Sequence, residues 1–149
     1  MDFFYQVSYF GPIILFFTVI ALMLYFYGFT LGNCLVFYII FYFFTMVLNK
    51  ALKLFFKQPR PIGGIAINKL DRLGLDRYGM PSGHANTAVF TLIFAILYFK
   101  NIYISIFFMV IALMTMIQRL VYKKHSFQQV CWGALIGATM GQLCYNICN

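Results

Sequence analysis

Two histidines, His84 and His125, are the residues of this sequence best suited to chemistry. An imidazole can attack phosphorus as a nucleophile, or it can protonate a leaving oxygen as a general acid. The sequence has no other histidine, and each of the two stands at the start of a long apolar run. An ionisable side chain at such a position is a functional hypothesis by default. We therefore predict that the two imidazoles belong to one reactive site.

Cations accompany the histidines at spacings that suit an anionic ligand. Lys53 and Arg60 follow the second apolar run, just before Pro61, and Arg119 lies at the end of the fourth run. A guanidinium presents a planar fork to phosphate oxygens, whereas an ammonium acts as a mobile point charge. Ordinary basic flanking of a membrane helix is an alternative interpretation, and the first two cations alone do not decide between them.

Ser82 is predicted to cap a helix that begins at Gly83 or His84. Free backbone N–H groups at the positive end of such a helix bind anions readily. A plain helix cap with an incidental histidine is the alternative, but the neighbouring basic stretch favours a phosphate site. The only acidic residues are Asp2, Asp71 and Asp76, and no cluster of carboxylates could hold Mg²⁺. We therefore predict phosphoryl transfer without a metal or other cofactor.

Long apolar runs must position these residues. Of the 149 residues, 63% are hydrophobic and only 9% are charged, whereas soluble domains have about a quarter charged residues. A membrane-spanning helix needs about 20 apolar residues. We therefore predict one membrane-embedded domain over residues 1–149, an all-α, polytopic transmembrane helix bundle of about five spans. The runs cover residues 11–31, 34–49, 85–99, 102–117 and 130–148.

The charges are distributed unevenly along the chain, whose net charge is +8. Alternation of the spans places the N-terminus, the polar stretch 50–79 and the segment 119–125 on one face. Ten of the 11 Lys and Arg residues fall there, and only Lys100 lies opposite. The positive-inside rule would make this face cytoplasmic, but cations that bind phosphate are placed by function, so the orientation stays open. No detached basic tail suggests a nucleic-acid partner.

Small residues in the apolar runs are predicted to serve packing. The four cysteines lie in or beside these runs, and an isolated buried cysteine usually behaves as a small hydrophobe. Gly133, Gly137 and Gly141 recur at every fourth position, which allows close approach of a second helix. We expect that helix to belong to the same chain rather than to a second copy.

Three motifs, in order, resemble those of the type 2 phosphatidic acid phosphatase superfamily: Lys-x6-Arg-Pro, Pro-Ser-Gly-His and Ser-Arg-x5-His-x3-Asp. They begin here at Lys53, Pro81 and Gln118 with the same internal spacing. The resemblance, which extends from about residue 50 to 141, implies a lipid phosphatase in the bilayer that needs no metal. It implies that His125 is the nucleophile, forming a phosphohistidine, and that His84 is the general acid. The phosphate oxygens would be bound by Lys53, Arg60, Ser82, the Gly83 N–H and Arg119.

Two residues depart from that pattern. Gln118 replaces the serine, and Gln129 replaces the aspartate that orients the nucleophilic histidine. The carbonyl of Gln129 could still fix the tautomer of His125, although it adds no negative charge. A slower or inactive enzyme is therefore one interpretation.

The stretch 125–133 and the run Tyr-Gly-Met-Pro-Ser at 78–82 are similar to the dolichyldiphosphatase branch, in which a glutamine stands at the position of Gln129. Gly83 departs from the serine that is common in that branch. This resemblance implies hydrolysis of a polyprenyl (dolichyl-type) diphosphate to the monophosphate and phosphate, in the endoplasmic reticulum membrane. The alternatives are a broad phosphatase of phosphatidate and other lipid monophosphates, and a non-catalytic lipid-binding membrane protein with a degenerate site.

Overall fold

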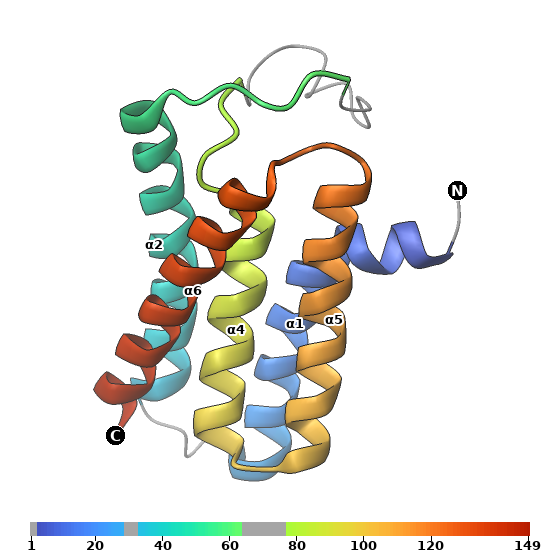
Figure 1. The fold of residues 1–149 in the computed structure, drawn as a ribbon. Helices are drawn as coiled ribbons and strands as arrows, with labels where there is room; N and C mark the ends of the chain where they lie inside the picture. The colour runs from blue at the N-terminus through green and yellow to red at the C-terminus, as the bar shows by residue number, and fades with distance from the viewer. Residues whose placement is uncertain (1–2, 29–32, 64–76) are drawn as a thin grey trace.

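The fold is an all-α bundle. A computed structural model describes residues 3–28, 33–63 and 77–149 of the chain. Its helices, drawn in Figure 1, are α1 (Phe3–Tyr27), α2 (Asn33–Phe56), α4 (Gly83–Phe99), α5 (Ile102–Val121) and α6 (Phe127–Cys148). The predicted fold class is confirmed. Much of the polar stretch predicted at 50–79, including Asp71 and Asp76, lies outside the described residues.

The second helix is longer than predicted. We expected the helical run to end near Asn49, but α2 continues to Phe56 and carries Lys50 and Lys53 in its last two turns. Lysine and leucine are good helix formers, so the two charges do not interrupt the helix. The predicted polar stretch therefore begins later, and Lys53 is held on a helix rather than on a loop.

The helix α4 occupies the centre of the bundle, between α2 and α6 on one side and α1 and α5 on the other (Figure 1). Its side chains are buried on nearly every face, among them Phe90 and Phe94. The glycines of α6 lie directly against it: a Cβ at Gly137 would overlap the carbonyl oxygen of Asn86, and one at Gly141 would approach that of Phe90. The prediction that these glycines serve packing within the chain is confirmed.

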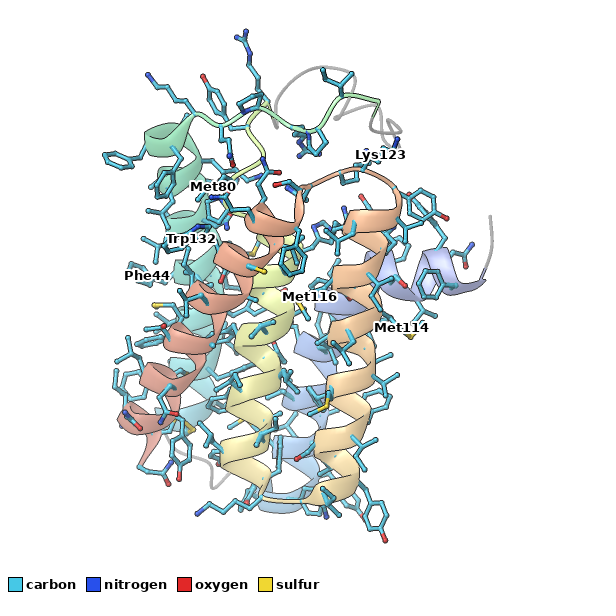
Figure 2. The ribbon with its side chains drawn as sticks, viewed as in Figure 1. Phe44, Met80, Met114, Met116, Lys123 and Trp132 are labelled. Carbon is cyan, nitrogen blue, oxygen red and sulfur yellow. A yellow bond between two sulfur atoms is a disulfide. The ribbon has the colours of Figure 1, made fainter. Side chains whose placement is uncertain are left out.

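The outer surface of the bundle is apolar. Phe44 on α2 and Trp132 on α6, both labelled in Figure 2, are 52% and 42% exposed. Within the described residues, α1, α2 and α5 are long and apolar enough to cross a membrane, and α4 is apolar but shorter. The helix α6 has sufficient length, but polar residues such as Gln142 and Asn146 make it less apolar. The chain is thus a multi-pass membrane protein whose outer side chains suit lipid.

A disulfide joins Cys34, in the first turn of α2, to Cys148, the last residue of α6. The Cα atoms are 4.9 Å apart and the cysteines are separated by 114 residues in sequence. The prediction of plain packing is therefore wrong for this pair, because their proximity depends on how α2 and α6 lie together rather than on local sequence. Cys144 is free and buried, as predicted, whereas Cys131 is free and exposed.

Candidate functional site

Two short extended segments lie side by side over one end of the bundle and bring the first two motifs together. Pro59 and Tyr78 form an isolated antiparallel bridge, and the Gly79 N–H donates to the Gln58 carbonyl oxygen at 2.8 Å. Figure 2 places Met80 and Lys123 at this same end. The segment before α4 and the turn between α5 and α6 therefore meet here.

His125 lies in that turn, with a side chain only 4% exposed. Its backbone N–H donates to the Arg119 carbonyl oxygen at 3.2 Å, which closes the chain over the end of α5. The ring Nδ1 lies 2.7 Å from the Gly79 carbonyl oxygen. Because a carbonyl oxygen can only accept, Nδ1 carries the proton and donates it, and Nε2 keeps a free lone pair. His125 is thus held in the tautomer that a nucleophile requires.

The charge state of His125 suits the same role. Burial, followed by the positive charges of Arg60, Lys53 and Arg119, lowers the pKa of His125 to about 3. The hydrogen bond to Gly79 opposes this shift but does not cancel it. The imidazole is therefore neutral at physiological pH, and its lone pair is not blocked by a proton. The positive charges of Arg60, Lys53 and Arg119 therefore act electrostatically on His125.

The hydrogen-bond partners of Gln129 differ from the predicted one. We predicted that it orients His125, but the structure gives that contact to the Gly79 carbonyl. The Gln129 Oε1 accepts from the Ser126 N–H at 3.1 Å as part of a capping box at the start of α6. Its Nε2 donates to the Gln58 Oε1 at 3.1 Å and to the Pro59 carbonyl at 2.9 Å. Gln129 thus ties α6 to the segment that follows α2, and its catalytic role stays a prediction.

Gly79 is the residue on which these contacts converge. A Cβ at this position would lie 2.5–2.7 Å from three atoms of the Gln129 side chain. A larger residue here would have to displace the Gln129 amide from its contacts, so glycine suits the place where the backbone passes between His125 and Gln129. The sequence shows this glycine between Tyr78 and Met80, but nothing in its spacing identifies its carbonyl as the partner of His125.

Ser82 takes the predicted N-cap position of α4, and it is fully buried. Its backbone N–H donates to the Gln129 carbonyl oxygen at 3.0 Å. Its side chain makes no capping hydrogen bond, and the Oγ has no hydrogen-bond partner among the described residues. The predicted side-chain cap is therefore not formed. The Ser82 hydroxyl instead stays buried and able to bind an oxygen of a ligand.

Asn49 supports this turn from α2. Its Nδ2 donates to the Pro81 carbonyl at 3.4 Å, and its Oδ1 would lie 3.2 Å from a Cβ at Gly83. Asn49 precedes Lys53 by four residues, so both lie on one face of α2. The four-residue spacing from Lys53 is the signal in the sequence that identifies Asn49 as a supporting residue.

His84 is the second residue of α4 and joins the other predicted residues. It interacts electrostatically with His125 and with the three cations Arg119, Lys53 and Arg60. The fold therefore brings together residues from α2, α4, α5 and the turns beside them. Their roles in catalysis and phosphate binding remain predictions, but an anion would meet three cations, a buried hydroxyl and two imidazoles.

A metal site is not evident in the part of the chain that the structure describes, where no three His, Cys, Asp or Glu residues lie together. The candidate ligands of the site are instead cations, a hydroxyl and backbone N–H groups, which bind oxyanions.

Comparison with known proteins adds one finding. A family model described as the PAP2 superfamily matches residues 32–149. The matched region includes every predicted site residue and leaves the whole of α1 outside. No curated protein and no solved structure matches the chain.

Proposed function

The chain belongs to the PAP2 superfamily, which makes it a phosphatase of lipid phosphates, and we propose that His125 is its nucleophile. The observation that carries this proposal is the hydrogen bond from the His125 Nδ1–H to the Gly79 carbonyl oxygen. It fixes the lone pair on Nε2, and the lowered pKa keeps that nitrogen unprotonated.

In the proposed first step, the His125 Nε2 forms a bond to phosphorus while the bond from phosphorus to the leaving oxygen breaks. His84 gives its proton to that oxygen, so the lipid leaves as a neutral alcohol or as a monophosphate. In the second step, water attacks the phosphohistidine and returns a proton to His84. Inorganic phosphate leaves, and His125 is restored.

The surrounding groups stabilise the charge of the transferring phosphoryl group. We assign its oxygens to Lys53, Arg60 and Arg119, because the positive charges of these three residues act on His125. The buried Oγ of Ser82 and the Gly83 N–H at the start of α4 supply further donors. Positioned cations of this kind carry out phosphoryl transfer largely by electrostatic stabilisation. The proposal therefore requires no metal.

We further propose that the substrate is a polyprenyl diphosphate and that the membrane is that of the endoplasmic reticulum. The support is the resemblance of residues 78–82 and 125–133 to the dolichyldiphosphatase branch. Gln129 fits this assignment, because its side chain joins α6 to the segment after α2 and is not a damaged partner of His125. The lipid tail would remain in the bilayer beside the apolar outer surface while the headgroup enters the site.

The test is phosphate release by the purified protein in detergent containing EDTA. We expect turnover of polyprenyl diphosphate to persist in EDTA and to be abolished in His125→Ala. A control variant is Lys100→Ala, which removes an exposed cation at the opposite end of the bundle and should leave the rate unchanged. Turnover by His125→Ala would contradict the nucleophile assignment.

A substrate panel separates the remaining assignments. Equal rates on phosphatidate and polyprenyl diphosphate would replace the narrow assignment by a broad lipid phosphatase. Absence of both turnover and a trapped phosphohistidine would indicate a lipid-binding protein with a degenerate site.

A further inference from the structure

Tyr9, on α1, reaches the candidate site from outside the region matched by the family model. Its ring centroid lies 5.5 Å from that of His84, with the planes tilted by 44°. The guanidinium carbon of Arg119 lies 5.3 Å from the centroid of the same ring. A single aromatic ring thus touches the proposed general acid and one of the proposed phosphate-binding cations.

The Tyr9 ring is itself held in place. Tyr5, one helical turn earlier and only 4% exposed, stacks on it with centroids 6.0 Å apart. Tyr122, which follows α5, meets Tyr5 edge-on at 5.0 Å. Pro12 lies inside α1, where a proline favours a kink, and the first turns of α1 run sideways from the bundle in Figure 1. These aromatic contacts anchor the turns that carry Tyr9.

We infer that Tyr9 is a positioning residue that sets the placement of His84 relative to Arg119, a role that rests on the proposed phosphatase function. The negative face of an aromatic ring attracts a guanidinium, which restrains Arg119. Contact with the same ring restricts rotation of the His84 imidazole. The ring therefore fixes the proton donor relative to the bound phosphate, and errors in such placement lower catalytic rates strongly.

The dependence of the rate on the leaving group distinguishes this role from simple packing. In a lipid monophosphate such as phosphatidate the leaving group is an alkoxide, which is a poor leaving group and needs the proton from His84, whereas nitrophenolate leaves readily without one. If Tyr9 positions His84, its loss lowers kcat for phosphatidate much more than for p-nitrophenyl phosphate. A general loss of structure would lower both rates alike.

The experiment compares Tyr9→Leu and Tyr9→Phe with Tyr25→Leu, which removes an 81% exposed tyrosine from the other end of α1. We expect Tyr9→Leu to lower kcat on phosphatidate by about tenfold or more, with a smaller loss on p-nitrophenyl phosphate and little change in KM. Tyr9→Phe keeps the ring and should retain most of the rate. Tyr25→Leu should behave as wild type.

Each contrary result has a distinct meaning. Equal losses of kcat on both substrates, or no loss of kcat in Tyr9→Leu, would overturn the role of Tyr9. Turnover by the wild-type protein would still uphold the proposed function in that case. Absence of wild-type turnover and of a phosphohistidine would overturn the proposed function and this inference with it.

Discussion

Gln129 illustrates how one side chain shapes a site without touching the reacting group. Its amide accepts from the Ser126 N–H and donates to the Pro59 carbonyl, so it depends on having both a donor and an acceptor. His125 meanwhile donates to the Gly79 carbonyl. A backbone carbonyl fixes the tautomer of an imidazole, but it does not stabilise positive charge on the ring as a carboxylate does. This arrangement suits a histidine that must remain neutral until it attacks.

Replacing Gln129 by aspartate tests this interpretation. A carboxylate offers no donor, and it would face two acceptors, the Gln58 Oε1 and the Pro59 carbonyl. It would also be too short to form both contacts. We expect Gln129→Asp to lower kcat by about tenfold or more and to lower the thermal unfolding midpoint. A rate above that of wild type would instead show that the site lacks a carboxylate partner for His125.

The lowered pKa of His125 predicts a pH dependence of stability. In the unfolded chain the histidine has a pKa of about 6.5, whereas in the folded protein it has a pKa of about 3. The unfolded state therefore binds the proton first, and the free energy of unfolding falls as the pH decreases from about 6.5 toward 3. At pH 5, protonation of His125 in the unfolded state should make the free energy of unfolding about 2 kcal/mol lower than at neutral pH.

The variant His125→Gln removes the titrating group and should therefore lose less stability over the same interval. Thermal unfolding midpoints of both proteins in detergent at pH 7 and pH 5 provide the measurement. Parallel losses in the two proteins would show that other groups cause the pH dependence.

At the scale of elements, the contact between α4 and α6 determines both stability and the site. A Cβ at Gly133 would overlap the Ser82 carbonyl oxygen, and a Cβ at Gly141 would press on that of Phe90. Each Gly→Ala substitution should therefore overpack the interface and cost about 1–3 kcal/mol of stability. Only Gly133→Ala should also lower kcat, because Ser82 belongs to the site and Phe90 does not.

Paired measurements of unfolding midpoint and kcat for these two variants provide the test. Equal kcat values for folded Gly133→Ala and Gly141→Ala would contradict this prediction. They would show that Ser82 keeps its position when the added methyl group displaces α6.

The sequence predicted these elements better than it predicted their contacts. Apolar length identified the five helical runs, and motif spacing identified His84, His125 and the cations that the fold brings together. The predicted end of α2 is too early, because lysine interrupts an apolar run but continues a helix readily. Tyr9 could not be singled out among 11 tyrosines, because its importance depends on how α1 lies against α4 and α5.

At the scale of the whole molecule, two kinds of residue close the bundle. Glycines allow α6 to approach the central α4, and association of helices in a membrane depends on such close packing more than on burial of apolar surface. The disulfide then joins α2 to α6 at the end remote from the site. Stability at that end can therefore change without a change in the reacting groups.

The double variant Cys34→Ser/Cys148→Ser should separate stability from catalysis. The disulfide closes a loop with a sequence separation of 114 residues, so its loss should destabilise the protein by about 2–4 kcal/mol. In a chain of this size that corresponds to a decrease in the unfolding midpoint on the order of 4–16 °C. We expect kcat below that midpoint to be unchanged, because the site lies at the other end of α2 and α6. Cys131→Ser, at an exposed free thiol, is the matched control and should change neither quantity. A fall in kcat without a fall in midpoint would show that the two ends of the bundle are coupled.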